Sequence, residues 1–141
     1  EKAKLLLIKN NISLISVSKY YETASWPNPK NPKFINIVLK AKCLLNPNQL
    51  LNLCKSIEVK LGRKKTLKNS PRECDIDIID FNSLILKGKL NLPHKRMHKR
   101  NFVLFPLFEI EKTWFHRLKK KNIKTLIFSL SNNDIRSIKQ I

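Results

Sequence analysis

The sequence predicts an α+β domain in which helices pack on one face of an antiparallel sheet. Two stretches carry this prediction. Residues 34–43, FINIVLKAKC, alternate with the period of two that a β-strand imposes on its side chains. Residues 46–62 place apolar side chains at helical spacing, between an asparagine N-cap followed by proline and a glycine that ends the helix.

Further elements are expected on both sides of these two. Residues 2–9 have helical spacing, and residues 12–23 are β-branched and alternate, so a helix and then a strand are expected. The later part of the chain is expected to hold a strand at 74–81, a short strand pair around Gly88 at 84–92, an apolar segment broken by Pro106 at 102–110, a helix at 123–131 and a last short segment.

The order helix–strand–strand–helix–strand over residues 1–81 matches a split βαβ unit that lacks its first strand. We therefore predict a ferredoxin-like core with additional C-terminal elements, in one domain over residues 1–141. We also expect that the complete protein has a strand before Glu1. On the predicted strand 34–43 the core face is expected to consist of Ile35, Ile37, Leu39, Ala41 and Cys43, and the opposite face begins with Phe34 and Asn36.

Composition narrows the class of protein. The formal net charge is +19, from 29 Lys and Arg against 10 Asp and Glu, which suits a polyanionic partner but also fits a general bias towards lysine. No apolar run approaches the ~20 residues of a membrane span, and no signal peptide is apparent, so a cytoplasmic protein is expected. The three cysteines are widely spaced, and we expect reduced thiols rather than a zinc site or disulfides.

The stretch PRECDIDIID at 71–80 concentrates carboxylates in this basic chain. On a strand, Asp75 and Asp77 share one face, while Asp80 lies at an odd offset and does not join them. Two neighbouring carboxylates repel each other unless a cation lies between them. Such a pair suits Mg²⁺, which takes one or two carboxylates together with phosphate oxygens and water. A solvated strand face is the alternative reading of the pair.

Cationic segments flank these carboxylates on both sides, at 63–72 and 95–100. A carboxylate pair framed by Lys and Arg suits a nucleoside triphosphate, because the cations neutralise charge in phosphoryl transfer. The chain has neither a P-loop nor protein-kinase signatures. His94 and His98 are four residues apart, but Pro93 favours a loop, so a histidine that bonds phosphate or structure is preferred to a zinc ligand.

Four motifs in order carry a resemblance to a known family. They are YYETASWPNPKNPKFINIV at 20–38, IEVKLGRKK at 57–65, SPRECDIDII at 70–79 and LPHKRMHKRNFVLFPLFEI at 92–110. Together they resemble the hydroxymethyldihydropterin pyrophosphokinases of folate biosynthesis. The chain departs from the family pattern at Ser70, Ala24 and Lys95, and it lacks the family's opening strand with its Gly-Ser-Asn turn.

The resemblance implies Mg²⁺-dependent transfer of pyrophosphate from ATP, the co-substrate, to the hydroxymethyl group of a reduced pterin. Two Mg²⁺ ions would be held by Asp75 and Asp77, and a monomer without membrane or specific nucleic-acid partners is expected. The resemblance also implies three groups of site residues: Arg63, Lys65 and Arg72 on phosphate-binding loops that take part in catalysis; Glu58, Arg72, His94 and Arg100 for the nucleotide; Thr23, Phe34, Asn36 and Phe102 for the pterin.

Two other functions remain open from the residues. A basic ferredoxin-like domain also describes RNA-recognition modules, although those expose aromatic side chains on the central strands, where this chain has carboxylates. A nucleotidyltransferase would also use an Asp-x-Asp pair, but it would release pyrophosphate instead of AMP.

Overall fold

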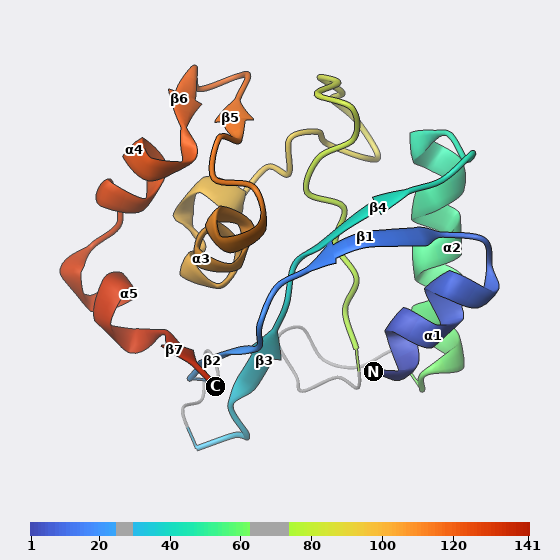
Figure 1. Ribbon diagram of the computed structural model, residues 1–141, viewed down its shortest axis with the longest axis horizontal. Coiled ribbons are helices and arrows are strands. Elements are labelled where there is room, and N and C mark those ends of the chain that lie inside the picture. Colours follow the sequence, from blue (N-terminus) through green and yellow to red (C-terminus); the bar gives the residue numbers. More distant parts are fainter. Residues whose placement is uncertain (25–29, 63–73) are drawn as a thin grey trace.

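The computed structural model describes residues 1–24, 30–62 and 74–141, and it has mixed helices and antiparallel strands (Figure 1). Helices α1 and α2 lie on one side of the molecule, α4 and α5 lie on the other, and α3 lies between them. The elements are α1 (Lys2–Lys9), β1 (Ser13–Val17), β2 (Tyr21–Thr23), β3 (Phe34–Asn36), β4 (Leu39–Lys42), α2 (Pro47–Lys60), the 3-10 helix η1 (Met97–Lys99), α3 (Asn101–Ile110), β5 (Phe115–His116), β6 (Lys121–Asn122), α4 (Ile123–Phe128), α5 (Asn132–Ser137) and β7 (Lys139–Gln140).

The two predicted strands 12–23 and 34–43 are each divided in two. β1 pairs antiparallel with β4, β2 pairs antiparallel with β3, and β7 adds a third strand beside β2. At the division Ser18 and Val38 exchange two bonds: the Ser18 N–H donates to the Val38 carbonyl at 2.9 Å, and the Val38 N–H donates to Ser18 Oγ at 2.9 Å. Because a side-chain oxygen replaces a backbone carbonyl here, the regular ladder stops and the hairpin continues as a second, separate sheet.

The division also changes which side chains of residues 34–43 are buried. Leu39 and Cys43 pack in a core cluster as predicted, and Ile37 is half-buried. Ile35 is 48% exposed and Ala41 is exposed, so their assignment to the core was wrong. Val38, predicted on the opposite face, packs against the cluster around α3. The break between β3 and β4 explains the exposure of Ile35, because a single alternation no longer holds across it.

The predicted helices near the N-terminus are confirmed, with their end signals. Asn46 caps α2 by accepting a bond from the Gln49 N–H, and the Gln49 side chain bonds back to the Asn46 N–H. Gly62 follows the helix at φ +94°, a conformation that glycine adopts without steric cost. α1 likewise ends where predicted, and Asn11 has φ +66°.

Residues 74–80 are not a strand, which corrects the prediction. The expected alternation of burial nevertheless holds: Asp75 and Asp77 are exposed, whereas Ile76 is half-buried and Ile78 is 8% exposed. The backbone of this segment bonds outside any ladder, since the Ile76 N–H donates to Glu58 Oε2 at 2.8 Å and the Ile79 carbonyl accepts from the His94 N–H at 2.9 Å. The strand pair expected at 84–92 is reduced to one bridge between Leu86 and Leu92.

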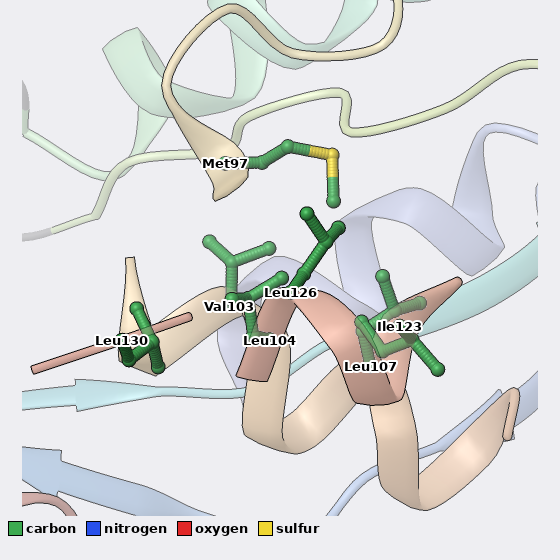
Figure 2. Close-up of a cluster of buried hydrophobic side chains, with 7 residues drawn as sticks. All are labelled: Met97, Val103, Leu104, Leu107, Ile123, Leu126 and Leu130. Atoms are coloured by element: carbon green, nitrogen blue, oxygen red, sulfur yellow. The ribbon is translucent and has the colours of Figure 1, made fainter. Parts of the chain in front are cut away.

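The apolar segment 102–110 is helical as part of α3, and Pro106 does not break it. Proline at this position removes the bond that its N–H would make to the Phe102 carbonyl, and its ring crowds the same carbonyl. Burial compensates, because the α3 and α4 side chains form a core cluster with η1 (Figure 2). This cluster consists of Met97, Val103, Leu104, Leu107, Ile123, Leu126 and Leu130, and it confirms the helical spacing predicted at 123–131. Within the described residues, no helix has the length and apolarity to cross a membrane.

Candidate active site

Asp75 and Asp77 are both exposed side chains of the segment 74–80. Ile76 and Ile78 anchor this segment by packing against α2 side chains, including Cys54. The side chain of Asp77 is 51% exposed, and its Oδ2 lies 3.6 Å from Nη1 of Arg100. The alternation of burial thus brings both predicted carboxylates to the surface together.

Arg100 connects the carboxylates to the predicted pterin residues. It precedes α3 as its N-cap residue and has extended backbone angles. Its guanidinium carbon lies 5.4 Å from the centroid of the Phe102 ring, within the range of a cation–π contact. Arg100 therefore contacts both a predicted metal-binding carboxylate and a predicted pterin-stacking ring.

His94 is held by its backbone and by one ring nitrogen. Its Nδ1 accepts from the Arg96 N–H at 3.1 Å, so the neutral ring carries its proton on Nε2 and can donate it. Burial lowers the pKa of His94, and the positive charges of Arg100 and Arg96 act in the same direction, against the opposing effect of Asp77. A neutral ring that donates one hydrogen bond is therefore the favoured form near neutral pH.

A cavity of about 170 Å³ opens beside Asp77 and His94. It is smaller than the usual range for ligand pockets, so it suits one part of a nucleotide rather than a whole nucleoside triphosphate. Apolar side chains of α2 and of the segment 74–80 contribute to its wall, and so do cationic side chains. The lining residues are Leu51, Ile76, Asp77, Ile78, Lys89, Leu90, Asn91, His94 and Lys95.

Glu58, predicted on the nucleotide side, is 5% exposed and lies in α2. Its carboxylate accepts the Ile76 N–H, between the two predicted metal ligands in the sequence. Glu58 therefore fixes the backbone that carries Asp75 and Asp77. The predicted residues Arg63, Lys65 and Arg72 lie outside the described residues.

The predicted pterin residues come from two elements. On the β2–β3 hairpin, Thr23 is paired with Phe34, and Asn36 is paired with Tyr21. Thr23 is 8% exposed and Phe34 is 39% exposed, so the ring is available at the surface. Phe34 and Asn36 are two residues apart on one strand and thus share a face, as predicted. Phe102 lies in the first turn of α3 and packs partly against the core cluster.

Sequence reasoning missed two residues near this site. Asp80, set aside as a bystander, accepts the Trp114 Nε1–H at 3.0 Å, and so it secures the segment behind the carboxylate pair. Asn101, between Arg100 and Phe102, is 8% exposed, and its amide nitrogen donates to the Asp134 carbonyl at 2.7 Å. No local pattern indicated the partner of either residue, because Asn101 stands at the boundary between the basic segment and the apolar segment 102–110.

The carboxylate pair fits Mg²⁺ better than a transition metal. Across the described ranges, no three His, Cys, Asp or Glu side chains gather as a metal-binding group. Two exposed carboxylates, with no third ligand among the described side chains, match the preference of Mg²⁺ for few carboxylates, with substrate phosphates and water completing its shell. Zinc sites use three or four protein ligands instead.

An α+β protein with two exposed carboxylates, one of them lining a cavity with a neutral histidine and lying 3.6 Å from an arginine, has the groups expected of a phosphate-transferring enzyme. Residues 1–112 match the family model of 7,8-dihydro-6-hydroxymethylpterin-pyrophosphokinase. The chain belongs to this family.

Curated relatives agree with this assignment. The chain is 38% identical over 114 residues to the 2-amino-4-hydroxy-6-hydroxymethyldihydropteridine pyrophosphokinase of Aquifex aeolicus, covering 80% of this chain and 71% of the relative. It is 40% identical over 100 residues to the protein of the same name in Bacillus subtilis, covering 70% of this chain and 60% of that relative. A folic acid synthesis protein of Dictyostelium discoideum is 40% identical over 102 residues, covering 72% of this chain and 16% of the relative.

Proposed function

We propose that this chain transfers pyrophosphate from ATP to the hydroxymethyl group of 6-hydroxymethyl-7,8-dihydropterin in folate biosynthesis. The pterin hydroxyl oxygen forms a bond to the β-phosphorus, and the bond from that phosphorus to the oxygen shared with the α-phosphate breaks. AMP leaves, the pterin diphosphate forms, and the hydroxyl proton passes to solvent. The observation that carries this proposal is the exposed pair Asp75 and Asp77, with Arg100 3.6 Å from Asp77 and the His94-lined cavity beside it.

The residues of the chain act mainly by positioning and by charge. His94 donates its Nε2 proton to an oxygen or nitrogen of the nucleotide, because its Nδ1 is already occupied by the Arg96 N–H. Arg100 neutralises negative charge that develops on the transferred group, and it contributes no proton because arginine stays charged. Glu58 keeps the carboxylate segment in place through the Ile76 N–H.

On the pterin side, Phe34 and Phe102 offer aromatic faces to the flat heterocycle, and Asn36 offers an amide to its polar edge. Thr23 completes this side from the neighbouring strand. Arg63, Lys65 and Arg72 act on the phosphates in this proposal, on grounds of sequence alone.

Asp75 and Asp77 would hold the metal. Bound Mg²⁺ would supply positive charge that neutralises the phosphate oxygens, so that they repel the attacking oxygen less. We infer two such ions from the family resemblance. In the same proposal the chain acts as a monomer in the cytoplasm, residues 1–141 form one domain, and its core is of the split βαβ type.

Product analysis tests the reaction directly. The purified chain is incubated with the reduced pterin and ATP, and the nucleotides are separated by chromatography. The proposal predicts one AMP for each pterin diphosphate formed, and it predicts that no AMP appears when the pterin is omitted. Release of free pyrophosphate with a pterin nucleotide would indicate nucleotidyl transfer and would refute the proposal, as would an absence of any turnover.

A further inference from the structure

Two of the three elements that carry the proposed pterin residues, β2 and α3, contact the C-terminal end of the chain. Thr23 lies on β2, and Phe102 lies in the first turn of α3. Residues 131–141, which we call the C-terminal strap, contact both elements. The family match ends at residue 112, so the strap lies beyond the matched region.

The first attachment is made by Asn101, the first residue of α3. Its side-chain amide nitrogen donates to the Asp134 carbonyl at 2.7 Å and lies 3.4 Å from Ser137 Oγ, both on α5. Asn101 is 8% exposed, so its amide has lost most contact with water and depends on these partners. Phe102 is the next residue in the sequence, so the same contact fixes the position of the first turn of α3, on which Phe102 lies.

The second attachment is the pairing of β7 with β2. Lys139 is opposite Glu22, Gln140 is opposite Tyr21, and the Ile141 N–H donates to the Tyr20 carbonyl at 2.9 Å. Figure 1 shows β7 beside β2, at the end of the molecule where the C-terminus lies. This strand holds β2 along the edge that faces away from β3.

The two attachments are close together along the chain. Ser137, which contacts Asn101, is two residues before Lys139, the first residue of β7, so at most about 7 Å of extended chain separates them. A third contact closes the arrangement, because the Tyr21 hydroxyl on β2 donates to Glu109 Oε1 in the last turn of α3 at 2.7 Å. The strap therefore limits how far the start of α3 can move from β2.

We propose that Asn101 is a positioning residue for the pterin site and that it acts by anchoring the C-terminal strap to the start of α3. This inference rests on the proposed function, since it assumes that Phe102 and Thr23 receive the pterin. Without the Asn101 contact, the first turn of α3 is free to shift against β2. Even a small shift of Phe102 matters, because a misplacement of about 1 Å in an active site can cost much in binding and rate.

The test compares Asn101→Ala with Asn133→Ala. Asn133 is an exposed residue of α5, so its replacement makes the same chemical change on the strap without removing the contact to α3. For Asn101→Ala we expect the KM for the pterin to rise about tenfold while kcat and the KM for ATP change less than about threefold. Asn133→Ala is expected to keep the wild-type constants.

Two kinetic outcomes would overturn the proposal. One is a wild-type pterin KM in Asn101→Ala. The other is a parallel rise of both KM values together with a fall in kcat, which would indicate general destabilisation rather than positioning.

Amide hydrogen exchange decides the matter independently of activity. We expect Asn101→Ala to accelerate exchange at Tyr21–Thr23 and in β7, whereas Asn133→Ala leaves both at wild-type rates. Unchanged exchange at β2 in Asn101→Ala would refute the proposal that Asn101 acts through the strap, even in a fully active enzyme. If the wild-type chain forms no AMP, the proposed reaction fails, and the exchange result still decides whether Asn101 couples the strap to β2.

Discussion

Asp80 differs in role from Asp75 and Asp77 although it lies only three residues after Asp77. Its Oδ2 accepts the Trp114 Nε1–H at 3.0 Å and its Oδ1 accepts the Phe81 N–H at 2.9 Å. Trp114 also packs edge-on against His116, with the ring centroids 5.6 Å apart. Asp80 therefore ties the carboxylate segment to the chain that leads into β5.

Replacing Trp114 tests this structural role. Trp114→Phe removes the indole donor and leaves an oxygen of Asp80 without its partner, so we expect the free energy of unfolding to fall by about 1–3 kcal/mol. Urea denaturation measures the change. Phe128→Leu is the control, because this aromatic side chain is 81% exposed, and it is expected to have little effect. A Trp114→Phe protein as stable as the wild type would show that the bond contributes nothing.

The sequence predicted that Asp75 and Asp77 share a face that Asp80 does not, but it did not predict the partner of Asp80. Alternation of burial requires only an extended backbone, and for that reason Asp75 and Asp77 lie together although no strand forms there. The contact of Asp80 with Trp114 spans 34 residues of sequence, and no local pattern encodes a contact of that length.

At the scale of elements, α1 and α2 were the most accurately predicted parts of the fold. The end signals of α2 are local, because the two residues of its capping box, Asn46 and Gln49, are three residues apart and Gly62 follows its last turn. The strands were less predictable because their divisions depend on Ser18 and Val38, which are 20 residues apart. The helix through Pro106 was missed because the sequence shows only the local cost of a proline inside a helix, and the burial of α3 outweighs that cost.

The capping box of α2 gives a test at this scale. Asn46→Ala removes the oxygen that accepts the Gln49 N–H, and we expect a loss of about 1 kcal/mol in the free energy of unfolding. Asn48→Ala, at an exposed position in the first turn of the same helix, is the matched control and should not lower stability. Equal effects of the two changes on thermal unfolding would contradict the assignment of the cap.

Over the whole molecule, the three histidines share one electrostatic property. Burial is the main cause that lowers the pKa of His94, His98 and His116. Nearby cations act in the same direction: Arg100 and Arg96 on His94, and Lys119 on His98 and His116. Asp77 opposes the shift at His94, and Asp80 opposes it at His116. The folded protein thus favours neutral histidines.

This property predicts how stability depends on pH. The unfolded chain takes up protons near the usual histidine pKa of 6.5, whereas the folded chain does so only at lower pH, so stability is full above about pH 7 and falls as pH decreases through the folded pKa values. The urea midpoint should therefore be lower at about pH 5.5 than at about pH 7.5. His98→Gln should reduce this difference, and an equal midpoint at the two pH values would refute the prediction.

The proposed reaction requires that Asp75 and Asp77, and not Asp80, form the catalytic carboxylate pair. The most direct measurement is the rate of AMP formation from ATP and the reduced pterin by Asp75→Asn, Asp77→Asn and Asp80→Asn proteins, each first shown to be folded by circular dichroism. Because each of the first two changes removes a charge that would hold Mg²⁺, we predict losses of about 10²-fold or more in kcat. Asp80→Asn is predicted to keep a rate close to that of the wild type. Near-normal AMP formation by Asp77→Asn, or an equal loss in all three proteins, would contradict the account.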